Sequence, residues 1–117
     1  MNSGCLFCKF IRREIPTSVV YEDDRAFAFR DINPQAKTHV LVVPKRHVAS
    51  IDTVAAEDEA EVGHLFAVAA KIAAQEGLKN GYRTVINCGD DAGQTVYHLH
   101  LHLVGGAPMG WPPFPVR

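Results

Sequence analysis

The chain has 117 residues, of which 47% are hydrophobic and 21% are charged, a composition typical of a globular protein and too apolar for a disordered one. Its formal net charge is −1 at pH 7, so it does not have the excess of basic residues by which proteins bind polymeric nucleic acids non-specifically. The length suits one hydrophobic core, so we expect a single domain over residues 1–117 with no nucleic acid polymer as partner.

The first half of the chain predicts a short helix and three strands. Residues 5–13 have the pattern of a helix that Pro16 stops, and residues 19–23 and 26–31 predict two strands around an Asp23-Asp24 turn. Residues 38–44 are rich in β-branched side chains and are bounded by prolines, which favours a third strand.

The second half predicts one long helix and two further strands. Over residues 56–78 apolar side chains recur at helical spacing behind an acidic start, and Gly77 or Gly81 is expected to end this helix. Residues 82–88 and 96–104 predict two strands separated by the loop 89–94, and residues 105–117 form a tail rich in proline and glycine. Five strands, one long helix and a short N-terminal helix define an α+β fold.

Three histidines alternate with leucines in the last predicted strand. Because successive side chains of a strand point to opposite faces, His98, His100 and His102 share one face at intervals of about 6.6 Å. A strand that needs only a soluble outer face would use threonine, lysine or glutamate, so three merely solvated histidines are the disfavoured alternative. Since imidazole titrates near neutrality, the row predicts a site of chemistry.

A metal ion is a second explanation for the histidine row. Zinc ligands lie little more than about 3 Å from one another, whereas alternate positions on a strand start about 6.6 Å apart. Adjacent members of the row can lean toward one ion, but His98 and His102 cannot easily do so together.

The loop before the last strand has the composition of an anion site. Gly89 and Gly93 allow backbone N–H groups to approach an anion closely, and Thr95 adds a hydroxyl group. The loop therefore predicts a phosphate cradle beside the histidines.

The sequence HLHLH followed by LVGG (residues 98–106) resembles the signature of the histidine triad superfamily. The segments FRDINPQAKTHVLVVPKRH, GYRTVINCGDDAGQTVYHLHLHLVGG and Trp111-Pro112-Pro113 are similar to its Hint branch, the histidine triad nucleotide-binding proteins. The resemblance implies a five-stranded antiparallel sheet that pairs, through the long helix and an edge strand, into a homodimer. It also implies binding of purine nucleoside monophosphates and hydrolysis of their phosphoramidates or of nucleotidylated amines.

The roles of individual residues follow from the same resemblance. It implies His100 as the nucleophile, His98 and His102 as its flanking residues, and His39 as a further active-site histidine. The nucleotide contacts that it implies are Asp31, Ile32, Asn87, Gly93, Gln94, Thr95, His100 and His102. The chain departs from the Hint pattern at Thr95, where serine is usual, and at residues 114–117, which extend the tail beyond Trp111-Pro112-Pro113.

The implied chemistry is consistent with the properties of imidazole. A neutral ring with one nitrogen held as N–H presents its other lone pair to phosphorus, so His100 can form a covalent nucleotidyl-histidine that water then hydrolyses. His102 or Thr95 can assist the departing amine, and N–H groups of the Gly93 loop can stabilise the phosphoryl oxygens. This step requires no metal ion.

The Cys5-x-x-Cys8 pair is a separate signal. Two thiols that pack a short helix are one explanation, and a thioredoxin-like redox pair would need a βαβ context that the chain lacks. Some bacterial histidine triad proteins have such a pair, and this resemblance implies a structural zinc ion held by Cys5, Cys8, His47 and His98. His98 would then be a metal ligand instead of a proton relay.

Cysteine usage and hydropathy indicate a compartment. An odd number of cysteines does not suit a disulfide framework, and no stretch approaches the roughly 18 apolar residues that span a bilayer. The first residues lack a basic segment followed by an apolar run. We therefore expect a cytoplasmic protein without a membrane partner.

Two alternative functions remain open. One is a dinucleoside polyphosphate hydrolase or nucleotidyltransferase of the same superfamily, which would keep His100 as nucleophile. The other is a nucleotide-binding scaffold whose slow hydrolysis is incidental.

Overall fold

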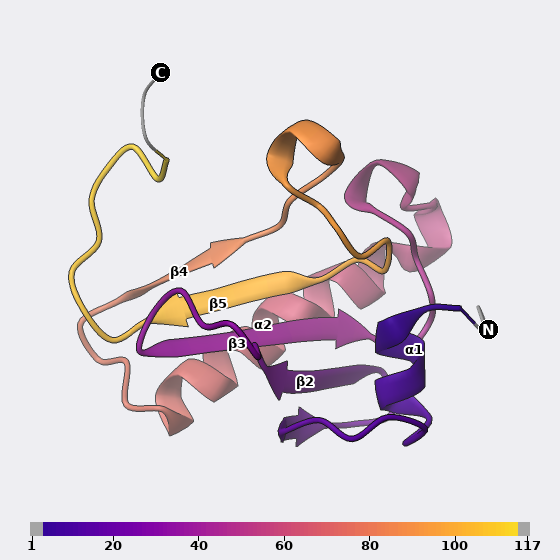
Figure 1. Cartoon of the computed structure of the whole chain (residues 1–117), viewed down its shortest axis with the longest axis horizontal. Helices are drawn as coiled ribbons and strands as arrows, with labels where there is room; N and C mark the ends of the chain where they lie inside the picture. The colour runs from indigo at the N-terminus through magenta and orange to yellow at the C-terminus, as the bar shows by residue number, and fades with distance from the viewer. Residues whose placement is uncertain (1–3, 115–117) are drawn as a thin grey trace.

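The computed structural model describes residues 4–114, which form a five-stranded antiparallel sheet in the order β1-β2-β3-β5-β4 with one long and one short helix (Figure 1). The helices are α1 (Leu6–Ile11) and α2 (Glu59–Gln75), and the strands are β1 (Val19–Glu22), β2 (Ala26–Arg30), β3 (Thr38–Pro44), β4 (Tyr82–Val85) and β5 (Leu101–Gly105). The α+β fold expected from the sequence is confirmed. Neither helix within residues 4–114 has the length and apolar character that crossing a membrane requires.

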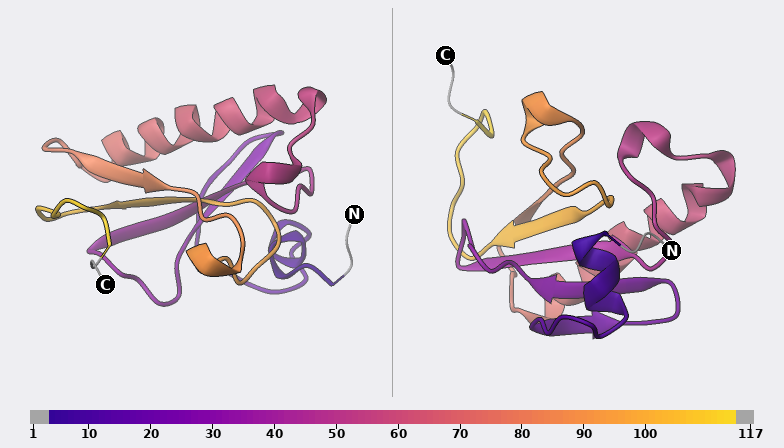
Figure 2. Two further views of the ribbon diagram at one scale, coloured as in Figure 1. Left: turned by 90° about the horizontal axis from the view of Figure 1, so that it is seen from above. Right: turned by 45° about the vertical axis from the view of Figure 1, so that its right-hand side comes forward.

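The sheet is covered on both faces, and this arrangement sets the direction of the side chains along its central strand. Val40 and Val42 of β3 pack in the core formed with α2, whereas Leu41 and Val43 pack with Phe7 of α1. Every residue of β3 is buried, as expected for a strand between two apolar layers. Figure 2 shows α2 on one face of the sheet, with α1 and the turn Asp90–Ala92 on the other.

The long helix ends at a glycine, as the sequence predicts. Gly77 has a φ of +74°, its N–H donates to the carbonyl of Ala74 (3.2 Å), and the N–H of Leu78 donates to the carbonyl of Ala73 (3.0 Å). These two bonds form a Schellman motif, which satisfies the last carbonyls of the helix. The α-helix begins later than expected, because residues Ala56–Asp58 form a separate 3₁₀ turn.

The last two strands are shorter than the sequence predicts. Within the expected strand 96–104, only Leu101 onward joins the sheet, because the N–H of Leu99 donates to the carbonyl of Val48 in the loop after β3 (2.6 Å). The prediction that all three histidines lie on one regular strand is therefore wrong, since only His102 belongs to β5. Tyr97, expected on the leucine face, is half exposed and donates its hydroxyl to Asp90.

The leucines of this segment nevertheless decide which way the histidines face. Leu99, Leu101 and Leu103 are buried in the core with α2. Because neighbouring side chains alternate, His100 and His102 face the α1 side of the sheet.

Asp23, in the turn between β1 and β2, connects this hairpin to α2. One carboxylate oxygen accepts from the N–H groups of Arg25 (2.8 Å) and Ala26 (2.7 Å), and the other accepts from the Tyr21 hydroxyl (2.9 Å) and from Nε2 of His64 (2.7 Å). Burial by itself raises the pKa of Asp23, but the four hydrogen bonds favour the carboxylate and hold its pKa far below the ordinary value. The charged form therefore stabilises the native state.

Asp23→Asn should lower the free energy of unfolding by about 2 kcal/mol near neutral pH, because a neutral amide offers one oxygen to four donors. Since the native pKa of Asp23 lies below the unfolded value of about 3.9, its contribution is complete above about pH 4 and is lost as the pH falls further. Urea unfolding of both proteins should give a difference in unfolding free energy at about pH 6 that shrinks at about pH 3. Asp24→Asn, at an exposed neighbouring position, is the control and should change stability by less than about 0.5 kcal/mol. A difference that does not vary with pH would contradict this role of Asp23.

Candidate active site

A cavity of about 630 Å³ opens between α1 and the histidine segment. Its apolar wall includes Phe7 and Phe10 of α1 and Phe29 of β2. Seven of the residues predicted from the sequence line its other parts, namely Asp31, Ile32, Asn87, Gly93, Thr95, His100 and His102. An apolar hollow with a few convergent polar groups is the usual form of a small-molecule site.

His100 has one ring nitrogen bound to the main chain and the other left for a ligand. Its Nδ1 lies 2.7 Å from the carbonyl oxygen of His98, so Nδ1 carries the proton and donates it. Burial lowers the pKa of His100 below its ordinary value, against the opposing effect of this hydrogen bond. The ring is therefore neutral at pH 7 with its lone pair on Nε2, which is the form of imidazole that can attack phosphorus.

His39 and His102 form a directed hydrogen-bond relay. The N–H of Gln35 donates to Nδ1 of His39 (3.0 Å), so the proton of His39 lies on Nε2, which donates to Nδ1 of His102 (2.9 Å). Burial, together with the closeness of the His100 and His39 rings, disfavours a charge on His102 and lowers its pKa to about 4, so this ring is also neutral. Its own proton then lies on Nε2, a buried donor without a hydrogen-bond partner within residues 4–114. Such a group suits a ligand oxygen or a departing nitrogen.

Three side-chain hydrogen bonds of Gln94 fix the loop beside the histidines. The side-chain oxygen of Gln94 accepts from the N–H of Gly89 (3.0 Å), and its amide group donates to the carbonyls of Ala49 (2.9 Å) and Val96 (3.2 Å). Gly89 and Gly93 both have a φ of +85°, in the left-handed region that favours glycine. Gln94 is thus buried within the protein and shapes the loop, whereas Gly93 and Thr95 line the cavity.

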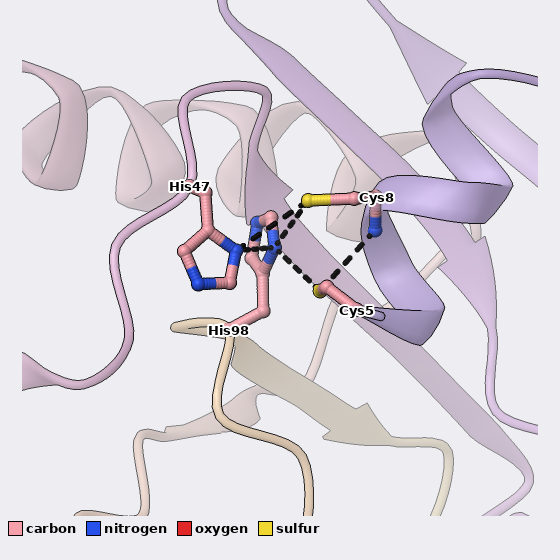
Figure 3. Close-up of side chains that lie close together, drawn as sticks. All are labelled: Cys5, Cys8, His47 and His98. Atoms are coloured by element: carbon pink, nitrogen blue, oxygen red, sulfur yellow. Dashed lines mark hydrogen bonds between the residues drawn. The ribbon is translucent and has the colours of Figure 1, made fainter. Parts of the chain in front are cut away.

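Cys5, Cys8, His47 and His98 converge on one point although they come from three separate segments (Figure 3). Cys5 caps α1 and Cys8 lies within it, His47 follows β3, and His98 precedes β5. Their sulfur and nitrogen atoms all lie within 4.8 Å of one another, and Nδ1 of His98 lies 3.3 Å from the sulfur of Cys5. We call this group the cysteine cluster.

The chemistry of the cysteine cluster fits a metal ion. Nε2 of His98 donates to the carbonyl of Pro44 (2.8 Å), which leaves the lone pair on Nδ1 directed at the two sulfurs. Burial lowers the pKa of His98 to about 4, so its ring is neutral, as a metal ligand must be. Two thiols and two imidazoles are a common ligand set for zinc.

In a second group, Asp31, His39 and His102, the side chains are spaced as metal ligands would be, but the nitrogen of His39 that faces the group carries a proton. Nε2 of His39 lies 3.4 Å from a carboxylate oxygen of Asp31 and 2.9 Å from His102, where an ion would have to bind. The hydrogen bond from Gln35 leaves the proton of His39 on that same nitrogen. The geometry therefore favours the relay over an ion at this position.

Sequence reasoning missed the contribution of α1 to the cavity. Leu6, Phe7 and Phe10 line it, and the sequence signal was available in the helical spacing of these apolar residues beside the cysteine pair. The two main-chain groups that select the imidazole tautomers, the carbonyl of His98 and the amide of Gln35, have no signal in the sequence.

Comparison with known proteins agrees with this geometry. A model of the HIT domain matches residues 12–109. The chain is 56% identical to an uncharacterized HIT-like protein of Synechococcus elongatus, over 97% of this chain and 99% of that protein. It is 51% identical to the purine nucleoside phosphoramidase of Escherichia coli K12, over 94% of this chain and 93% of that protein.

Solved structures give the same result. The crystal structure of a HIT family hydrolase from Legionella pneumophila Philadelphia 1 superposes with a TM-score of 0.92 at 50% identity, covering 95% of this chain and all of that one. A HIT family hydrolase from Clostridium thermocellum superposes with a TM-score of 0.91 at 44% identity, over 94% of this chain and 96% of that one. The resemblance found in the sequence motifs is confirmed, and the chain belongs to the HIT domain family, the histidine triad proteins.

Proposed function

We propose that this chain hydrolyses purine nucleoside phosphoramidates or nucleotidylated amines through a covalent nucleotidyl intermediate on His100. The observation that carries this proposal is the neutral His100 ring, whose Nδ1 is bound to the His98 carbonyl and whose Nε2 is left for substrate at the cavity. The names of two relatives, purine nucleoside phosphoramidase and HIT family hydrolase, support the reaction class.

The nucleotide would lie along the cavity. Its base would pack between the aromatic wall and Ile32 at the rim, and its ribose hydroxyls would donate to the Asp31 carboxylate. The phosphate would lie beside Gly93, Thr95 and Asn87, where backbone N–H groups and a hydroxyl can bind its oxygens.

In the reaction that we propose, His100 would form the bond to phosphorus and His102 would transfer a proton. Nε2 of His100 attacks phosphorus, the bond from phosphorus to the leaving nitrogen breaks, and the amine leaves with a proton from Nε2 of His102 or the hydroxyl of Thr95. The hydrogen bond from Nε2 of His39 to Nδ1 of His102 (2.9 Å) keeps the transferable proton of His102 on Nε2. Water then attacks phosphorus, the bond from phosphorus to Nε2 of His100 breaks, and a proton of that water returns to Nε2 of His102, which leaves both histidines neutral. His98 contributes its carbonyl group to this scheme, and its ring belongs to the cysteine cluster.

His100→Asn should lower kcat/KM for adenosine 5'-phosphoramidate on the order of 10⁴-fold or more, while AMP binding changes only a few-fold, because the nucleophilic nitrogen is lost and the cavity is kept. With a slow substrate, peptide mass spectrometry should locate the nucleotidyl group on His100 of the wild-type protein. His102→Asn should cost less, and His64→Asn, on α2 and bonded to Asp23, is the matched control with near-normal turnover.

Three outcomes would contradict the proposal. A nucleotidyl group found on His98 or His102 would show that a histidine other than His100 is the nucleophile. Faster turnover of dinucleoside polyphosphates than of phosphoramidates would favour a dinucleoside polyphosphate hydrolase. AMP binding without turnover of either substrate would favour a scaffold.

We further propose that the cysteine cluster holds one structural zinc ion per chain, with Cys5, Cys8, His47 and His98 as ligands. The ion would join α1 to the segment after β3 and to the segment before β5, and the chemical step would not use it. The convergence of four matched donors, with His98 oriented by Pro44, supports this proposal.

Protein purified without chelator should contain about one zinc per chain by elemental analysis. Cys5→Ser should lower the zinc content and reduce the melting temperature by roughly 5 °C or more, because a ligand thiolate is lost. Cys88→Ser, at the cysteine outside the cluster, is the control and should keep the metal. Stoichiometric zinc that persists after both Cys5 and Cys8 are replaced would contradict the site.

We also propose that the chain forms a homodimer through α2 and the edge strand β4. β4 pairs only with β5 in the described sheet, so its outer edge is left for a second sheet. The outward face of α2 exposes Phe66 beside small side chains such as Ala67 and Ala70. The tail lies near β4, where Arg83 donates to the carbonyl of Gly110 (2.8 Å), and it would extend toward the partner's site.

Sedimentation at micromolar concentration should report twice 12.8 kDa. Phe66→Glu should yield monomers, because it introduces a charge into the proposed interface. Val19→Glu, on the opposite edge strand at a similar exposure, should remain dimeric. A wild-type monomer, or dissociation by the Val19 substitution alone, would count against this interface.

A further inference from the structure

The two residues between the cysteines of the cluster are both cavity residues. Leu6 and Phe7 line the proposed nucleotide site, while Cys5 and Cys8 on either side of them belong to the cysteine cluster. Phe7 is buried, and its ring lies 5.1 Å from the ring of His100 with the two planes at 88°. Building on the proposed function, we propose that Phe7 is a positioning residue that holds the His100 imidazole ready for attack, and that the cysteine cluster holds Phe7.

The His100 ring is confined by neighbours of two kinds. Its Nδ1 is fixed by the hydrogen bond to the His98 carbonyl, and its faces and edges are restricted by the rings of Phe7 and of His102, which lies 5.0 Å away. Phe7 is itself supported by Phe29 at 5.2 Å. A perpendicular aromatic contact at this distance is attractive and directional, so it selects one ring orientation. Attack on phosphorus needs that orientation, because misplacement by about 1 Å can cost roughly 10²-fold in rate.

The cysteine cluster connects to the nucleophile by two routes. In the first, the N–H of Cys8 donates to the sulfur of Cys5 (3.4 Å), which closes the short segment that carries Phe7. In the second, both sulfurs approach Nδ1 of His98 (3.3 and 3.5 Å), and the carbonyl of the same residue accepts from His100. A change in the cluster therefore reaches His100 through the Phe7 ring and through the His98 main chain.

The test compares two phenylalanines of the same cavity wall. Phe7→Leu removes the ring that contacts His100, and Phe10→Leu is the matched control, since in the described part of the chain the ring contacts of Phe10 are with Phe7 and Phe29. Phe7→Leu should slow formation of the nucleotidyl-His100 adduct in a single turnover by about 10- to 100-fold, with AMP affinity changed no more than in Phe10→Leu. Phe7→Tyr keeps the ring and should restore most of the rate.

Nitrogen NMR of the ligand-free protein provides a readout that does not depend on turnover. In the wild type, His100 should give one set of signals with the proton on Nδ1, and Phe7→Leu should shift or broaden these signals, while Phe10→Leu, at a ring that contacts Phe7 and Phe29 within the described residues, should change them much less. Cys8→Ser, which leaves the Phe7 side chain intact, should shift the same signals. If Phe7→Leu does not fold, Phe7→Met, whose unbranched and flexible side chain can adapt to the space and has no ring, replaces it.

The outcomes separate this inference from the function on which it rests. If wild-type protein forms no adduct on His100, the proposed function fails. If the adduct forms but Phe7→Leu matches Phe10→Leu in rate and in the His100 signals, the positioning role of Phe7 is refuted. If Phe7→Leu slows the adduct while Cys8→Ser leaves the His100 signals unchanged, the connection to the cysteine cluster is refuted.

Discussion

The site depends on one constraint, which is that a buried imidazole is neutral and so has one nitrogen to donate and one to accept. In His39, His98 and His100 a main-chain group binds one ring nitrogen, and this determines whether the other nitrogen donates or accepts a hydrogen bond. Pro44 accepts from His98 and directs its lone pair at the cysteines, and the carbonyl of His98 accepts from His100 and leaves its lone pair for the cavity. The amide of Gln35 donates to His39, which therefore donates to His102. Chemically identical side chains thus receive different properties from backbone groups.

The same constraint separates two groups of residues that spacing alone does not distinguish. Both the cysteine cluster and the group of Asp31, His39 and His102 bring candidate ligand atoms within 4.8 Å. In the cysteine cluster, the lone pair on Nδ1 of His98 points to the centre of the four donors. In the group of Asp31, His39 and His102, the proton on Nε2 of His39 occupies the corresponding position. Proximity of histidines and carboxylates is therefore a weak criterion for a metal site until the second nitrogen of each ring is accounted for.

The two-sided sheet explains why the cavity and the cysteine cluster lie together. β3 is buried on both faces, with α2 packed on one and α1 on the other, and the leucines of β5 pack against α2. The histidines between these leucines must face the α1 layer. α1 is short and carries both cysteines and part of the aromatic wall, so the two sites share a helix and the segment 98–100.

The sequence by itself determined the α+β fold, the boundaries of β3 and the end of α2 at a glycine, with Gly77 and Gly81 both left open, because each depends on local signals such as β-branched runs, prolines and glycines. Alternation and loop composition also predicted that His100, His102, Gly93 and Thr95 lie at the site, whereas Asp31, Ile32 and Asn87 were implied by the resemblance to the histidine triad family. The sequence did not determine where β5 begins, because the register of residues 96–100 is decided by Val48, a long-range partner. Only the tertiary structure decided three further features, namely the aromatic wall, the hydrogen bonds by which Gln94 fixes the loop, and the tautomer of each imidazole. All three depend on main-chain groups or side chains that folding brings close together.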